Sequence, residues 1–204
     1  MQLLQRLYPV TAGRITLSGV DVNDIERHHL RRNVGIVLQE PFLYSRTIGE
    51  NIAIARPDAD LSDVYAAART ASVHDVIESF SEGYDTVVGE RGVTLSGGQK
   101  QRCACARALI NHPKIVYADE PTGALDSKSA RMLLETFTHM NEQMNATILM
   151  VTHDAFSASY CKRILFLKDG KIFHELQKGS KSRKKFLDEI LDVLSLTGGD
   201  GDAE

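Results

Sequence analysis

The sequence predicts an α/β sheet with a helical subdomain inserted into it. Short apolar runs alternate with helical stretches along most of the 204 residues, and this alternation is typical of a sheet covered by helices. Between about residues 48 and 112 the pattern is helical throughout, which indicates an insertion. A chain of this length can bury the core of one domain with a subdomain.

Strands are expected where short apolar runs are bounded by polar or turn residues. They are predicted at residues 13–20, 33–39, 114–118, 146–152, 163–167 and 171–174. Helices are predicted at residues 24–32, 61–71, 73–80, 97–111, 128–143 and 184–196. Asp169-Gly170 is a hairpin-turn signal between the last two strands. The last helix is expected to be amphipathic, with an apolar face that comprises Leu187, Ile190, Leu191 and Leu194. Residues 198–204 are expected to be disordered.

Composition argues against several classes of protein. A net charge of −3 gives no sign of a nucleic-acid partner, and no apolar run approaches the length of a membrane span. Three cysteines cannot pair completely, which favours a reduced, cytosolic setting. A role at a membrane would therefore require a membrane-spanning partner.

Polar residues follow three of the predicted strands. Asp119 and Glu120 end the strand at 114–118, His153 follows the strand at 146–152, and Gln39 ends the strand at 33–39. Ligands bind at the carboxyl ends of strands in open α/β sheets. A hard cation such as Mg²⁺ fits Asp119, while Glu120 can polarise a water molecule. The alternative is a strand end that turns into solvent with both carboxylates hydrated.

A helix start with two adjacent glycines lies at residues 96–99. Ser96 as N-cap and Gln99 three residues later have the spacing of a capping box. Gly97 and Gly98 leave the first-turn N–H groups, including that of Gln99, unshielded and pointing outward at the positive end of the helix dipole. This arrangement suits a phosphate group. The alternative is a flexible loop that ends in a helix.

Four segments together resemble the ATP-binding cassette (ABC) ATPases. They are LSGGQKQR at 95–102, KIVYADEP at 114–121, ALD at 124–126 and VTHD at 151–154, in the order and approximate spacing of that family. The resemblance covers residues 3 to 172. It implies a P-loop NTPase (RecA-like) core sheet with an inserted α-helical subdomain, and hydrolysis of ATP with Mg²⁺ as the metal.

The resemblance also implies roles for single residues. Asp119 would bind Mg²⁺ through water, Glu120 would be the general base, and His153 would contact the γ-phosphate. Gln39 would link Mg²⁺ and the attacking water to a membrane partner, and Asp126 would lie at the seam of a dimer.

Residues 96–99, which are Ser96, Gly97, Gly98 and Gln99, would be the family's signature, in contact with ATP bound to the opposite subunit. The implied partners are a second ABC ATPase domain, in a homodimer or heterodimer, and a transmembrane permease. The implied location is the cytoplasmic face of the membrane.

The family's phosphate loop, G-x-x-x-x-G-K-[ST], has no match in these residues. We therefore expect a chain truncated before that loop and incomplete at its N-terminus, which by itself binds ATP poorly. The expected segments are a partial core at 1–47, the helical subdomain with the signature at 48–112, the remaining core at 113–176, and a C-terminal helix with an acidic tail at 177–204.

The two halves of the chain resemble different subfamilies. TIGENI at 47–52 and TVVGERG at 86–92 are similar to exporter-type cassettes, whereas YADEPTGALDS, TILMVTHD and the C-terminal stretch are similar to the antimicrobial-peptide-resistance, lipoprotein-release and macrolide-export ATPases. One hypothesis is a recombinant joined near residues 108–113, and the alternative is one divergent subfamily.

The leading interpretation is the ATPase subunit of an ABC transporter that exports peptides, lipids or drugs. The alternatives are a catalytically impaired fragment with a binding or regulatory role, and a soluble ABC ATPase outside transport. A DNA-acting member of the second class should carry a coiled-coil insertion or paired zinc-binding cysteines, and the sequence has neither.

Overall fold

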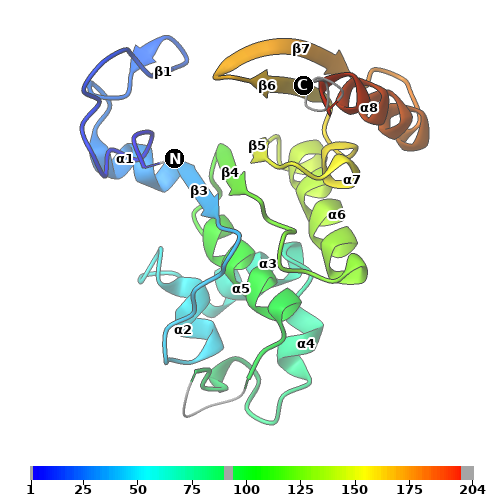
Figure 1. Ribbon diagram of the computed structural model, residues 1–204. Coiled ribbons are helices and arrows are strands. Elements are labelled where there is room, and N and C mark those ends of the chain that lie inside the picture. The colour runs from blue at the N-terminus through cyan, green and yellow to red at the C-terminus, as the bar shows by residue number, and fades with distance from the viewer. Residues whose placement is uncertain (1, 90–93, 199–204) are drawn as a thin grey trace. The chain divides into compact units, whose positions relative to one another are not determined.

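The computed structural model describes residues 2–89 and 94–198. The chain divides into two compact units, Met1–Met150 and Val151–Glu204, and each is considered by itself (Figure 1). The elements of the first unit are β1 (Thr16–Leu17), β2 (Val20–Asp21), α1 (Arg27–Asn33), β3 (Val34–Val37), α2 (Ile48–Ala53), α3 (Leu61–Thr70), α4 (His74–Glu78), a 3₁₀ turn (Gly83–Asp85), α5 (Gly97–Leu109), β4 (Ile115–Asp119), α6 (Ser127–Gln143) and β5 (Thr147–Val151), the last of which runs to the boundary between the units.

The central sheet has the strand order β3-β4-β5. β3 and β4 are parallel, with a register that pairs Val34 with Ile115 and Val37 with Ala118. The two strands are joined through the whole helical segment between them, as parallel pairs require a long crossover. Helix α5 packs closely on β3, since a Cβ atom at Gly35 would lie 2.7 Å from the Ala108 carbonyl oxygen. The predicted strands at 33–39, 114–118 and 146–152 are therefore confirmed, with slightly different ends.

The N-terminal strand is a hairpin rather than the single strand predicted for residues 13–20. β1 and β2 pair antiparallel around Ser18-Gly19, and both turn residues have positive φ, 49° and 82°. Positive φ at both central residues is the geometry of a tight two-residue hairpin. The hairpin packs on a small apolar cluster whose buried members are Val22, Leu30 and Val34.

The helices of the inserted region share one core. α2 and α3 both pack on α5, and the side chains between them are almost fully buried: Ile48, Ile52, Val64, Ala68, Cys103, Cys105, Ala106 and Leu109. Cys103 and Cys105 are both 0% exposed and fill this core as small apolar side chains. Residues 90–92 of the exporter-like TVVGERG stretch lie outside the described part of the chain.

The second unit holds α7 (Ala155–Ala158), β6 (Arg163–Lys168), β7 (Lys171–Gln177) and α8 (Arg183–Gly198). The β6–β7 hairpin turns at Asp169-Gly170, as predicted, with φ of 50° and 73°. The C-terminal helix packs on this hairpin through Phe186 and Ile190, which are 0% and 1% exposed.

The predicted apolar face of the C-terminal helix is partly wrong, because Leu191 and Leu194 are exposed. The residues that contact the hairpin repeat with the spacing i, i+4, i+7, and they are Phe186, Ile190 and Val193. Residues 199–204, for which disorder was predicted, lie outside the described residues, and Gly198 ends α8. Within residues 2–89 and 94–198, every helix is too short or too polar to cross a lipid bilayer.

Candidate nucleotide site

The site begins where the two parallel strands end. The last paired residues of β3 and β4 are Val37 and Ala118. Asp119 follows Ala118 directly, and Gln39 lies two residues after Val37. The structure therefore brings Gln39, Asp119 and Glu120 to one edge of the sheet, as the sequence predicted. Both carboxylates are half-buried there.

A tight turn after β4 places the Gln39 side chain. Glu120 has a φ of 42°, a left-handed conformation that is uncommon for a residue other than glycine, and its carbonyl accepts a hydrogen bond from the Gly123 N–H at 3.0 Å. A Cβ atom at Gly123 would lie 2.8 Å from Nε2 of Gln39. The absence of a side chain at Gly123 thus lets Gln39 lie against the turn that carries Glu120. Strained backbone of this kind is common at functional sites.

Helix α5 begins with the predicted capping box. The Gln99 N–H donates to Ser96 Oγ at 3.2 Å, and the Ser96 N–H donates to Gln99 Oε1 at 2.8 Å. Ser96 and Gly97 are exposed. The helix start is therefore ordered by local hydrogen bonds while part of it stays open to an approaching group.

One expectation about this turn is wrong. The N–H groups of Gly97, Gly98 and Gln99 were all expected to point outward unshielded, but the Gln99 N–H is used by the cap. Gly98 is buried, and a Cβ atom there would lie 2.8 Å from Ser129 Cβ and still closer to Ser129 Oγ. Gly98 therefore serves the close approach of α5 to α6, and Gly97 alone presents an open backbone.

Asp126 is the N-cap of α6. Its carboxylate accepts hydrogen bonds from the N–H groups of Lys128 and Ser129, each at 3.0 Å, and from Ser129 Oγ at 2.8 Å. The Ser129 N–H, followed by its hydroxyl, holds the pKa of Asp126 below its ordinary value of 3.8. Because Ser129 also faces Gly98, residues 96–99 and the turn at Asp126 lie together in this chain.

His153 belongs to the second unit. It is exposed and lies between the end of β5 and α7. The next residue, Asp154, caps α7 by accepting from the Ser157 N–H at 2.9 Å and the Ser157 hydroxyl at 2.6 Å. This cap fixes the backbone beside His153.

Three polar residues that the sequence reading did not single out connect α5 to the stretch after β3. Gln101 Nε2 donates to the Leu38 carbonyl at 2.7 Å, and Arg107 Nη1 donates to the Phe42 carbonyl at 2.8 Å. Arg107 also donates hydrogen bonds to the backbone carbonyl and the side-chain oxygen of Asn51. The sequence signal that could have identified these residues is a polar side chain within an otherwise apolar helix face.

Comparison with known proteins agrees with this geometry. Residues 1–123 match the family described as ABC transporter. The chain is 43% identical over 172 residues to the Bacillus subtilis ATP-binding/permease protein YgaD, and the match covers 84% of this chain and 29% of YgaD. It is 40% identical over 205 residues to the Bacillus subtilis ABC transporter ATP-binding protein YvcR, covering 98% of this chain and 77% of YvcR.

A solved structure is also similar to this chain. The chain superposes on a bacterial Atm1-family ABC exporter with ATP bound, with a TM-score of 0.77 and 34% identity, and it covers 34% of the exporter chain. The fold and the family match define a nucleotide-binding domain of the P-loop NTPase class. The chain belongs to the ABC transporter family, as an ATP-binding cassette of the kind whose members hydrolyse ATP.

Proposed function

We propose that this chain hydrolyses ATP to power export of peptides, lipids or drugs through a transmembrane permease, at the cytoplasmic face of the membrane. The observation that carries the proposal is the meeting of Gln39, Asp119 and Glu120 at the carboxyl edge of β3 and β4. Similarity to an exporter with ATP bound supports the direction of transport. The substrate depends on the permease, because a cassette of this fold serves many transporters.

The reaction is in-line transfer of the γ-phosphoryl group to water, in which positioning and charge neutralisation supply most of the rate. Glu120 accepts a proton from the attacking water, and its backbone has a left-handed φ of 42°. Gln39, held against Gly123, orients the same water. By the family resemblance, His153 would contact the γ-phosphate.

The side chains at this edge fit Mg²⁺. Mg²⁺ prefers oxygen ligands and takes one or two carboxylates together with phosphate oxygens and water. Asp119 and the Gln39 amide oxygen supply such donors, and among residues 2–89 and 94–198 no cluster of three or more His, Cys, Asp or Glu forms a dedicated metal cage. When bound, Mg²⁺ would neutralise the charge of the phosphates.

The start of α5 acts on a second subunit in this proposal. The Ser96 oxygen accepts from Gln99 within the cap, so its own hydroxyl hydrogen can be donated to a phosphate oxygen. The exposed Gly97 N–H lies at the positive end of the helix. These groups would contact the γ-phosphate of ATP held by the partner, with Asp126 near the seam of the dimer. The four segments 1–47, 48–112, 113–176 and 177–204 remain a proposal for the domain organisation.

Hydrolysis of Mg·ATP tests the proposal against a role as a binding or regulatory partner. These 204 residues contain no phosphate-loop motif, so the assay uses the chain extended by a phosphate-loop segment from a relative, with the unextended chain measured beside it. A general base contributes about 10²–10⁴-fold to a rate, and Glu120→Gln is expected to lower turnover by that order while ATP binding persists. Equal turnover in the two extended proteins would favour the binding role.

A further inference from the structure

The stretch after β3 is attached to helix α5 at both of its ends. We call residues 38–44 the Gln39 loop. At one end, Gln101 Nε2 donates to the Leu38 carbonyl at 2.7 Å. At the other end, Arg107 Nη1 donates to the Phe42 carbonyl at 2.8 Å. Both donors lie on the helix whose first turn is residues 96–99.

The Arg107 anchor is reinforced by Asn51. Arg107 donates to the Asn51 carbonyl at 2.8 Å and to Asn51 Oδ1 at 3.1 Å. The same Oδ1 atom accepts from the Tyr44 N–H at 2.8 Å, and Asn51 Nδ2 donates to the Tyr44 carbonyl at 2.9 Å. The far end of the Gln39 loop is therefore held by several hydrogen bonds, whereas at its near end Gln101 donates the side-chain hydrogen bond from α5.

Glutamine at residue 101 is energetically unfavourable, because a polar side chain is buried there. Its side chain is fully buried, and its Oε1 atom makes no hydrogen bond within residues 2–89 and 94–198. A buried acceptor without a partner costs more free energy than a typical single hydrogen bond returns, so the bond from Nε2 does not by itself offset the unpartnered Oε1 atom. Stability alone does not account for glutamine here, so the one bond that it makes requires another explanation.

That bond lies next to the residue that the proposed function uses. The Leu38 carbonyl belongs to the same peptide group as the Gln39 N–H, so fixing it also fixes the backbone of Gln39. The Gln39 side chain then lies against Gly123 in the turn after Glu120. The hydrogen bond from Gln101 thus connects α5 directly to the peptide group of Gln39.

We propose that Gln101 is a positioning residue that fixes the Gln39 peptide to helix α5, so that Gln39 and residues 96–99 move as one body. This inference rests on the proposed function for the importance of Gln39. The attachment itself is a property of the chain without nucleotide. Its test can therefore fail or succeed independently of ATP hydrolysis.

The test substitutes Gln101→Met and follows the free chain by NMR. Loss of the bond is expected to shift the Leu38 carbonyl ¹³C signal upfield. It should also lower the order parameter of the Gln39 amide from about 0.85, typical of rigid backbone, toward about 0.6. The unfolding midpoint should change little, because the substitution also removes the unpartnered Oε1 atom. Gln101→Asn, which keeps the amide but shortens its reach, should give the same local change.

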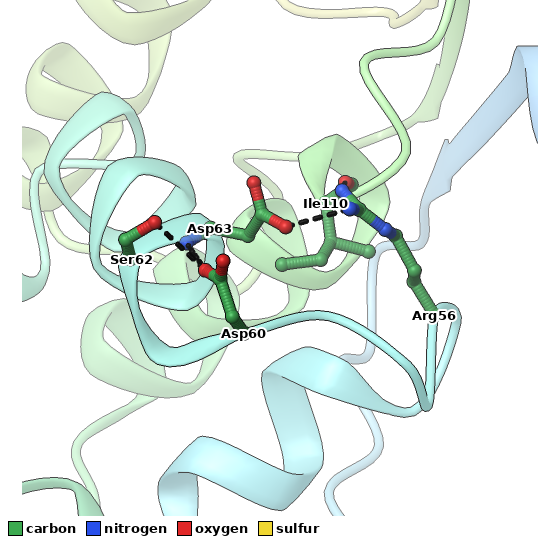
Figure 2. A network of polar contacts seen from close by, with 5 residues as sticks. All are labelled: Arg56, Asp60, Ser62, Asp63 and Ile110. Carbon is green, nitrogen blue, oxygen red and sulfur yellow. Dashed lines mark hydrogen bonds and ion pairs between the residues drawn. The ribbon is translucent and has the colours of Figure 1, made fainter.

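Arg56→Met is the matched control. Figure 2 shows Arg56 with Ile110 and Asp63. Arg56 donates to the carbonyl of Ile110, the C-cap of α5, at 3.3 Å and pairs with Asp63 at 2.6 Å. This variant also removes a long side chain bonded to a carbonyl of the same helix region, but it does not touch the Gln39 loop. It should leave the Leu38 and Gln39 signals unchanged. An unmoved Leu38 signal in both Gln101 variants, or equal changes in Arg56→Met, would overturn the proposal.

Discussion

Replacing each of the two adjacent glycines at the start of α5 with alanine should change the stability of the chain in opposite directions. A Cβ atom at Gly98 would lie 2.8 Å from Ser129 Cβ, closer than real side chains approach. Ser129 cannot simply rotate away, because its hydroxyl donates to Asp126 at 2.8 Å and its N–H donates to the same carboxylate at 3.0 Å. At Gly97 the closest atom would be the Ala124 carbonyl oxygen at 3.4 Å, an ordinary contact.

The expected change in unfolding free energy combines one stabilising effect and two destabilising effects. Alanine in place of glycine stabilises a helix by up to about 1 kcal/mol. Overpacking a filled site costs about 1–3 kcal/mol, and disturbing the Ser129 hydrogen bond adds about 1 kcal/mol. The net expectation is a loss of roughly 1–3 kcal/mol for Gly98→Ala. For Gly97→Ala, where only the stabilising effect acts, the expectation is a gain of up to about 1 kcal/mol.

Urea unfolding of the two variants and the parent chain measures this difference. The midpoint should fall for Gly98→Ala and stay level or rise for Gly97→Ala, with similar slopes. If both variants were equally stable, or if Gly98→Ala were the more stable, the close approach of α5 to α6 would not be the reason for glycine at residue 98.

Three further predictions concern single sites. Gly123→Ala should displace the Gln39 side chain, 2.8 Å away, and shift its amide NMR signals while changing stability by only about 0.5 kcal/mol; unchanged signals would contradict the contact. Because the folded pKa of Asp126 is depressed, its contribution to stability is present above 3.8 and is lost as the pH falls through the lower folded value. Asp126→Asn, which keeps a cap, should therefore lose less stability between pH 5 and 2 than the parent does (both pH limits are approximate), and parallel curves would refute this. Burial raises the pKa of the Cys103 and Cys105 thiols to about 12, so iodoacetamide should label them only after unfolding, and fast labelling of the native chain would contradict their burial.

Much of the fold follows from local pattern. The apolar runs at 33–39 and 114–118 predict β3 and β4, because buried parallel strands are continuous in hydrophobicity. The two hairpins show the limit of this reading. The sequence predicts a turn at Asp169-Gly170 but places Ser18-Gly19 within a strand, although both pairs have positive φ at each residue. Serine lacks the preference for that conformation that makes an Asp-Gly pair a strong turn signal.

The candidate site is predictable where it depends on strand ends and caps. Gln39, Asp119 and Glu120 follow buried strands, and Ser96 with Gln99 has capping-box spacing. The bond between Gln101 and Leu38 joins residues 63 positions apart, and no local periodicity specifies such a partner.

The spacing of the glycines does not show why glycine occupies each position. The sequence shows two glycines at 97 and 98 but not which of them faces a ligand. The packing of α6 decides that question, because it buries Gly98 and leaves Gly97 exposed.

In the proposed function, residues 96–99 act on nucleotide that is bound by another subunit. Hydrolysis of ATP by a mixed dimer tests this role most directly. In that dimer, this chain is paired with a cassette that carries a phosphate loop and whose own signature is disabled. The mixture is expected to hydrolyse ATP. Ser96→Arg in this chain should abolish the activity, and Lys128→Arg, a conservative change of an exposed residue, should preserve it. Activity that survives Ser96→Arg would mean that Ser96 only caps its helix.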